Sequence, residues 1–260
     1  MASVGRHRAL PPVTVLLSLL GLVLPFVLWE VNAQAQQNLL VPKLGEIVQA
    51  LQESAESGAL WYNASVTLRS ALCGLLLAVV VGVALGTAMA QSRLLEAVLS
   101  PLLGASYPVP KLALYPVAIL IFGLGTLPVV ILVALECMYP IAYNTFQGVR
   151  STPRELVRAA ANSEGGPLRT FGAVHVPSAL PSVMTGLRIA VPIMIVVAVV
   201  VEMLGQSRGL GFLIRDAGRA IEPALALGVI LLLGVVGVAL DFLIKMATRR
   251  LVFWEVAPGE

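Results

Sequence analysis

The chain has 260 residues and a formal net charge of +3, and 58% of its side chains are hydrophobic while only 12% are charged. Soluble globular proteins carry about 25% charged residues, so this composition argues against a soluble enzyme. The small net charge also argues against nucleic acid as a partner. The composition indicates a protein whose solvent is membrane lipid.

Six apolar segments are predicted to cross the membrane as helices. Residues 9–29 and 70–92 hold no charged side chain, and each can span a hydrocarbon core of about 30 Å at ~1.5 Å per residue. Residues 112–149 are long enough for two crossings, with glycines and a proline between them. The sequence therefore predicts an all-α membrane protein with one domain. Its predicted spans are about 10–29, 66–90, 110–124, 127–148, 179–203 and 223–243.

The first apolar segment has an alternative interpretation as a cleaved signal peptide. Arg6 and Arg8 precede it, and residues 33–35 resemble a peptidase site. A signal peptide has an apolar core of about 7–15 residues, and this one is longer. We therefore expect a retained first helix.

The positions of Lys and Arg predict that both chain ends are cytoplasmic. With that orientation, ten basic residues fall on inner segments and four on outer ones. Basic residues are enriched in cytoplasmic loops, so this orientation is favoured.

Small residues recur every four positions along the second span. They are Gly74, Ala78, Gly82, Gly86 and Ala90. Small residues allow helices to approach closely in lipid, where packing holds them together. We expect a packing face, and a surface that slides during a transport cycle is the alternative.

The cytoplasmic loop at about residues 149–178 is predicted to contain a helix outside the membrane. Thr152, Pro153 and Glu155 have the spacing of a capping box with proline at the first helical position. Helix-forming residues continue to about residue 164, and Gly165 ends the run. Such a helix either fits a groove on a partner or rests on lipid headgroups.

Four ionisable residues within the spans are candidates for a translocation pathway: Lys111, Glu136, Arg188 and Glu202. Charge at membrane depth is costly and usually faces a cavity or a partner. We expect Glu136 to line the pathway, because no basic residue is evident at its depth. Pairing or snorkelling is the alternative for Lys111 and Arg188. Glu202 alternatively contacts a binding protein or holds the loop after it.

No catalytic or metal-binding set is predicted. Cys73 and Cys137 lie in apolar runs, and His175 is expected to be a packed or interfacial residue. The chain also has no G-x-x-x-x-G-K-[ST] phosphate loop. The chain therefore cannot hydrolyse ATP through that motif, and any such energy source must lie on another polypeptide.

The stretch from Pro153 to Gly211 resembles the permease subunits of bacterial ABC importers, in the nitrate, aliphatic-sulfonate and taurine group. The matching residues are Arg154-Glu155-Leu156-Val157, Ala159-Ala160, Val176-Pro177, Ala179-Leu180-Pro181-Ser182, Gly186-Leu187-Arg188-Ile189-Ala190, Glu202-Met203-Leu204 and Gly209-Leu210-Gly211. Leu40-Val41-Pro42, Pro110 to Gly125, and Tyr139-Pro140-Ile141 to Asn144-Thr145 also resemble the family, so the resemblance covers about residues 10–254.

The resemblance implies an ABC importer permease fold in the bacterial inner membrane. It implies as partners two ATP-binding subunits, a second permease copy and an extracytoplasmic solute-binding protein, with lipid around them. The family's loop is a coupling helix, here about residues 153–164. The residues expected to contact the ATPase are Arg154, Glu155, Arg158, Ala159, Ala160, Glu164 and Gly165.

Two positions depart from the family's loop pattern. Aligned through Leu180-Pro181-Ser182, the family's glutamate falls on Arg158 and its glycine on Glu164. An ATPase with a complementary acidic site is one explanation, and a second, different permease with the ordinary loop is another.

The implied cargo is a small organic or inorganic anion. Glu136 in the pathway would disfavour an anion, so a neutral or cationic nutrient precursor stays open. A secondary transporter or channel without an ATPase is the main alternative function.

Overall fold

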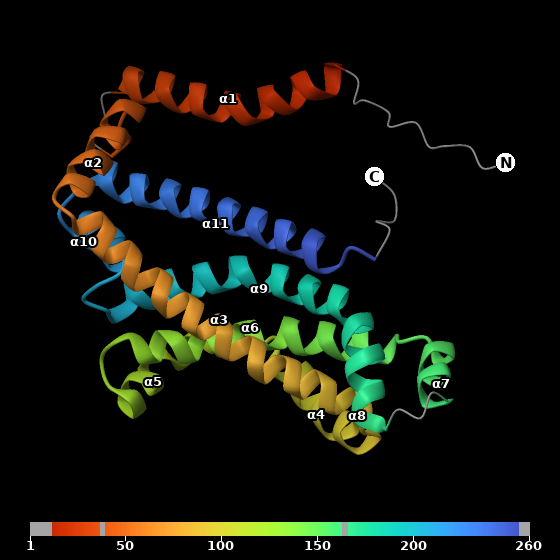
Figure 1. Ribbon diagram of the computed structural model, residues 1–260. Coiled ribbons are helices and arrows are strands. Elements are labelled where there is room, and N and C mark those ends of the chain that lie inside the picture. Colours follow the sequence, from red (N-terminus) through yellow and green to blue (C-terminus); the bar gives the residue numbers. More distant parts are fainter. Residues whose placement is uncertain (1–11, 37–39, 163–165, 255–260) are drawn as a thin grey trace.

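The computed structural model describes residues 12–36, 40–162 and 166–254, and within these ranges every regular element is a helix (Figure 1). The elements are α1 (Pro12–Gln36), α2 (Leu44–Glu56), α3 (Ala59–Gln91), α4 (Arg93–Ser106), the 3₁₀ turn η1 (Lys111–Leu114), α5 (Tyr115–Phe122), α6 (Thr126–Arg150), α7 (Arg154–Asn162), α8 (Pro167–Thr170), the π-helical η2 (Phe171–His175), α9 (Val176–Gly205), α10 (Leu210–Arg219) and α11 (Pro223–Leu251).

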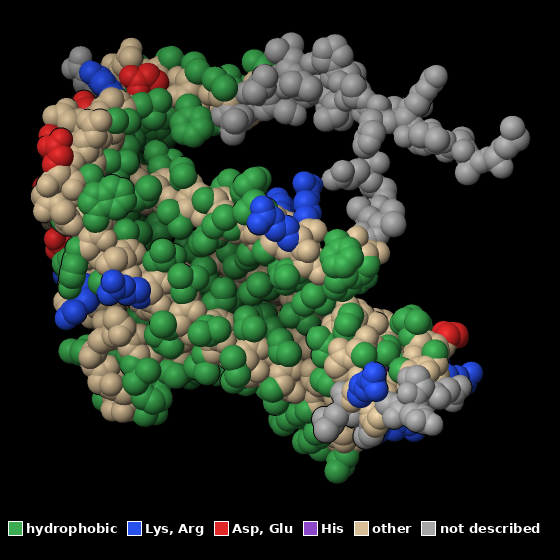
Figure 2. Space-filling model, viewed as in Figure 1, with side chains coloured by type: hydrophobic (Ala, Val, Ile, Leu, Met, Phe, Trp, Pro, Cys, Tyr) green, Lys and Arg blue, Asp and Glu red, His purple; other side chains and the backbone are tan. Residues whose placement is uncertain are grey.

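The core lies where α3, α6 and α9 pack together. Leu132, Val133 and Ile141 of α6 are fully buried between Ala78 of α3 and Met194 of α9. Figure 2 shows hydrophobic side chains over the middle of the molecule, with charged side chains gathered toward its two ends. This distribution suits a bundle whose middle is surrounded by lipid.

The small-residue stripe of α3 brings its backbone onto α6. A Cβ built on Gly74 would lie 2.7 Å from the Val133 side chain, and one on Gly86 would lie 2.4 Å from the Ala142 carbonyl oxygen. Only glycine permits this approach, so the stripe serves as a packing face, as the four-residue spacing predicts.

Four helical segments among the described residues are long and apolar enough to cross a membrane: Ala59–Gln91, Thr126–Arg150, Phe171–Gly205 and Pro223–Leu251. They coincide with four of the six predicted spans. Helix α1 (Pro12–Gln36) covers the first predicted span, and the count of six stays a prediction.

The span predicted at about 110–124 is not one continuous helix. The segment begins as the turn η1 and continues as α5, whose eight residues reach only ~12 Å. Helix α4 and the η1–α5 segment are bent by 86° relative to each other and form at most one broken crossing. Pro108 and Pro110 lie at the bend and supply no backbone N–H to a continuous helix.

Gly86→Ala is expected to destabilise the bundle by about 1–3 kcal/mol, because the new methyl group overlaps the α6 backbone. The midpoint of thermal unfolding in detergent measures the effect. Gly234→Ala in α11 is the matched control, since a Cβ there meets nothing within 4 Å. Equal melting temperatures for the two variants would contradict the packing of α3 on α6.

Candidate functional site

Helix α7 lies outside the membrane helices, at the end of the bundle where α6 ends and α9 begins (Figure 1). Seven residues are predicted to contact the ATPase, and the structure describes five of them. Arg154, Glu155, Arg158 and Ala159 are exposed, and Ala160 is half-buried. The other two, Glu164 and Gly165, fall outside the described residues. The Leu156 side chain is also 51% exposed, so the helix presents an apolar group beside its charged ones.

The Thr152 hydroxyl does not cap α7 in the way that the capping box predicts. It donates to the Val149 carbonyl at 2.8 Å and lies 3.1 Å from Nδ1 of His175. The first helical bond of α7 runs instead from the Val157 N–H to the Pro153 carbonyl. A threonine just after a helix can donate a hydrogen bond back to the last turn of that helix. Here the Thr152 hydroxyl bonds to the end of α6 and not to the start of α7.

The same contact ties three segments together. His175 belongs to the π-helical turn η2, and its ring lies 6.0 Å from that of Phe171. Through Thr152, this turn at the start of α9 is joined to the end of α6 and the beginning of α7. His175 is thus a packed residue, as the sequence predicts. Short π-helical segments are frequent at functional positions in helices.

Lys111 and Glu136 form an ion pair at 3.2 Å, and their side chains are 10% and 22% exposed. The expectation that Glu136 has no basic residue at its depth is therefore wrong. Because the 110–124 segment begins as a short turn beside α6 rather than as a full crossing, Lys111 reaches the middle of α6.

A polar and aromatic stripe continues from Glu136 along the more exposed face of α6, and the sequence analysis missed it. The Tyr139 ring lies 4.4 Å from the tilted ring of Tyr107 and stacks with that of Tyr143 at 6.1 Å, measured between centroids. Gln147 donates to the Tyr143 hydroxyl, and Arg150 pairs with Glu96 of α4. The recurrence of these residues at three- and four-position steps is the signal that could have identified the stripe.

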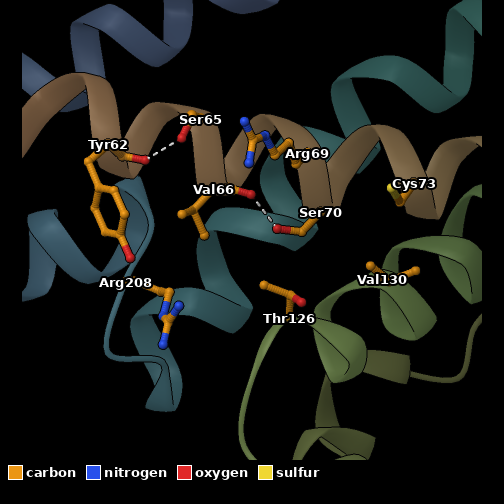
Figure 3. A pocket seen from close by; sticks show the side chains of 9 residues that line it. All are labelled: Tyr62, Ser65, Val66, Arg69, Ser70, Cys73, Thr126, Val130 and Arg208. Carbon is orange, nitrogen blue, oxygen red and sulfur yellow. Dashed lines mark hydrogen bonds between the residues drawn. The ribbon is translucent and has the colours of Figure 1, made fainter.

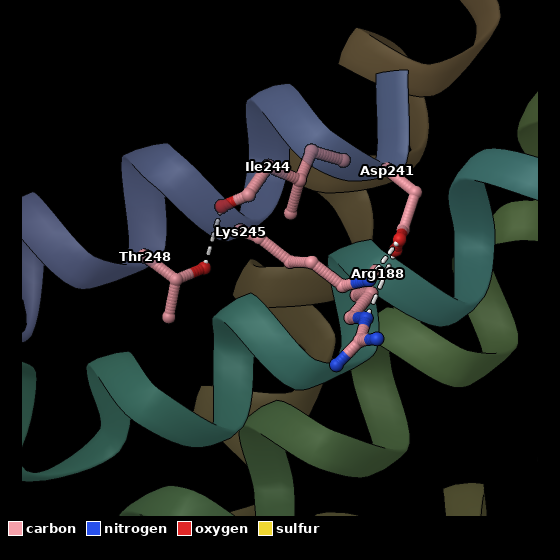
Figure 4. Close-up of polar contacts among 5 residues, drawn as sticks. All are labelled: Arg188, Asp241, Ile244, Lys245 and Thr248. Atoms are coloured by element: carbon pink, nitrogen blue, oxygen red, sulfur yellow. Dashed lines mark hydrogen bonds and ion pairs between the residues drawn. The ribbon is translucent and has the colours of Figure 1, made fainter. Parts of the chain in front are cut away.

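Arg188 lies in a different place from the Lys111–Glu136 pair. Its Nε contacts Asp241 Oδ1 of α11 at 3.0 Å, and Lys245 Nζ contacts the other oxygen of Asp241 at 2.5 Å (Figure 4). This cluster joins α9 to α11. Pairing, the alternative that the sequence left open, is confirmed for Arg188 and for Lys111.

Glu202 is 1% exposed and holds the segment between α9 and α10. Its Oε2 accepts from the Thr67 hydroxyl at 2.7 Å and from the Gly211 N–H at 3.0 Å. Thr67 in turn accepts from the Leu210 N–H. Gly209 has φ +104°, and a Cβ on it would lie 2.3 Å from the carboxyl carbon of Glu202, so the site requires glycine there.

The four predicted pathway residues therefore occupy three separate places. Lys111 and Glu136 meet at the contact of η1 with α6, Arg188 joins α9 to α11, and Glu202 anchors a loop. Within the part of the chain that the structure describes, no group of three potential metal ligands is found.

Residues 74–253 match the family model described as "Binding-protein-dependent transport system inner membrane component". The chain is 28% identical over 239 residues to the taurine transport system permease protein TauC of Escherichia coli, covering 90% of this chain and 87% of TauC. It is 32% identical over 250 residues to the formylaminopyrimidine transport permease protein ThiX of Halalkalibacterium halodurans, covering 96% and 97%.

A solved structure with the same fold is that of the MetNI methionine ABC transporter in an inward-facing conformation. The TM-score is 0.61 at 20% identity, and the match covers 72% of this chain and 91% of the other. At this identity the likeness supports the fold alone.

Glu202→Ala is expected to destabilise the protein by about 1–3 kcal/mol for each buried donor that it leaves unpaired, Thr67 and Gly211. Glu202→Gln keeps an acceptor oxygen and should cost less. Thermal unfolding, combined with proteolysis at the loop before α10, measures both effects. A Gln variant as unstable as the Ala variant would contradict a hydrogen-bonding role.

Glu136→Ala is expected to cost about 1–3 kcal/mol, because it leaves the buried Lys111 ammonium without its partner. Lys111→Ala combined with Glu136→Ala should cost less than the sum of the two single changes. Glu96→Ala breaks a more exposed ion pair and serves as control, with an expected cost below about 1 kcal/mol. Strict additivity of the two changes in the melting temperature would contradict the pairing.

Proposed function

The chain belongs to the family of binding-protein-dependent transport system inner membrane components, and from this membership we propose an assembly and a cargo for it. It is a permease subunit of an ABC importer and not the ATPase. We infer that it works with two ATP-binding subunits, a second permease copy that is identical or related, and an extracytoplasmic solute-binding protein. ATP and Mg²⁺ are bound by the partner ATPase subunits.

In this proposal α7 is the coupling helix. Its exposed Leu156 and flanking arginines offer a mixed apolar and charged surface, as a helix that docks into a protein groove requires. Its attachment also supports the role, because the Thr152–His175 contact joins its base to both α6 and α9. Displacement of α7 by the ATPase pair would therefore act on two core helices at once.

Both chain ends are proposed to lie in the cytoplasm. Figure 1 places α7 at the end of the bundle where α11 also terminates. The last part of α11 carries Lys245, Arg249 and Arg250, and α7 carries two further arginines. Gathering of basic residues at one end supports a cytoplasmic location for that end.

We propose a small organic or inorganic anion as cargo. The Lys111–Glu136 pair is compatible with an anion, because the lysine offsets the carboxylate that would otherwise repel it. The stripe of α6, from Glu136 to Arg150, is the proposed wall of the pathway, since a polar face at membrane depth is unfavourable against lipid. Relatives named for taurine and for formylaminopyrimidine differ in cargo, so the anion rests on this electrostatic argument.

Arg158→Glu is expected to weaken co-purification of the cognate ATPase about tenfold, equivalent to ~1.4 kcal/mol, if Arg158 meets an acidic site on it. The matched control is Arg93→Glu, an exposed arginine at the start of α4 in the same end of the bundle. Quantitative pull-down and ATP-dependent uptake of radiolabelled taurine or nitrate in proteoliposomes measure the effect. Undiminished uptake by a preparation that lacks any ATPase would contradict the proposed function and favour a secondary transporter or channel.

A further inference from the structure

A pocket of about 520 Å³ opens at the end of the bundle opposite α7. Its walls come from the first half of α3, the first turns of α6 and the loop between α9 and α10 (Figure 3). Arg69 lines it from α3 and Arg208 from the loop, while Tyr62, Ser70 and Thr126 add hydroxyl groups. None of the lining side chains is acidic.

The two arginines are available to a ligand. In the described part of the chain, neither guanidinium has an ion-pair or hydrogen-bond partner, whereas Lys111, Arg150, Arg188 and Lys245 are all paired. A guanidinium carries five N–H donors and no acceptor. Two such groups around one cavity, with no carboxylate among them, favour an anion with several oxygen atoms.

The remaining donors also suit an anion. Thr126 is the first residue of α6 and lines the pocket, and Gly125 before it supplies no side-chain cap, so the positive end of the α6 dipole lies at the cavity. The hydroxyls of Ser65 and Ser70 already donate to helix carbonyls. The positive charge and unused donors therefore come from the arginines and from the start of α6.

We propose that this pocket binds the oxyanion group of a small solute, such as a sulfonate, nitrate or carboxylate, at the outer end of the permease. The identification of this oxyanion as the transported cargo rests on the proposed import function. The binding of an oxyanion by the pocket does not depend on that function. Arg69 directly precedes the uncharged residues 70–92 and so lies near the membrane boundary, where a lipid phosphate offers the same chemistry. The experiment must therefore separate a solute from a lipid headgroup.

The thiol of Cys73 reports on the pocket, because it lines the cavity and is exposed, whereas Cys137 is buried. The full chain, purified with its partners and held in phosphatidylcholine liposomes without ATP, is treated with methanethiosulfonates of equal size and opposite charge. The sulfonate-bearing reagent should modify Cys73 about tenfold faster than the trimethylammonium reagent, relative to their rates on a free thiol. Ethanesulfonate should slow that modification saturably, while chloride at the same ionic strength should not.

Variants identify the side chains that cause the charge preference of Cys73 labelling and its protection by ethanesulfonate. Arg69→Gln and Arg208→Gln should each reduce both the charge preference and the protection by ethanesulfonate. Arg219→Gln removes an exposed arginine of α10 outside the pocket and should leave both unchanged. Cys73→Ser should abolish the signal. Equal rates for the two reagents, or equal slowing by chloride and ethanesulfonate, would overturn the proposal.

A lipid arm separates the two sources of the oxyanion. Protection that requires phosphatidylglycerol in the liposomes, and that ethanesulfonate does not produce, would assign the pocket to a headgroup and overturn a solute site. Because labelling needs neither ATP nor coupling, protection by ethanesulfonate can persist even if the Arg158 experiment contradicts the proposed function. The two failures are thus distinguishable.

Discussion

Close contact between the backbones of α3 and α6 is the constraint on which the rest of the structure depends. Lipid tails are as apolar as the helix surfaces, so the hydrophobic effect does not drive helices together in the membrane. Helices there associate through packing and internal hydrogen bonds. Gly86 allows the α3 backbone to approach the Ala142 carbonyl. This contact fixes where the first half of α3, which contains Thr67, lies relative to α9. Thr67 then meets Glu202, and the loop before α10 is held between them.

The ionisable groups in the bundle serve different purposes because their surroundings differ. Glu202 is enclosed and accepts hydrogen bonds from α3 and α10, so it acts as a structural anchor. Arg188, Asp241 and Lys245 carry a net positive charge across the contact of α9 with α11. Lys111 and Glu136 compensate each other on the face of α6 that the core leaves open. Only the last pair lies on a polar surface that continues along a helix.

The sequence predicts best what is encoded locally. Length and apolarity were sufficient for α3, α6, α9 and α11, and the glycine spacing was sufficient for the packing face. Hydropathy alone could not predict the break at residues 107–110, because it ignores how closely spaced prolines interrupt a helix. The Lys111–Glu136 pair depends on that break, since it sets the depth at which Lys111 meets α6. The Thr152 hydroxyl was misassigned because two helix ends compete for it, and only the three-dimensional arrangement decides between them.

Helix α6 joins the two ends of the molecule at which ligands are proposed. Helix α6 begins at Thr126, beside the pocket lined by Arg69 and Arg208. It ends at Arg150, two residues before Thr152, which contacts His175 at the base of α7. An oxyanion at one end and an ATPase at the other would thus act on one continuous helix, which contains Pro140. Energetic coupling between two binding sites is reciprocal. If the ATPase alters the position of α6, it alters oxyanion affinity, and an oxyanion in the pocket must change ATPase affinity by the same factor.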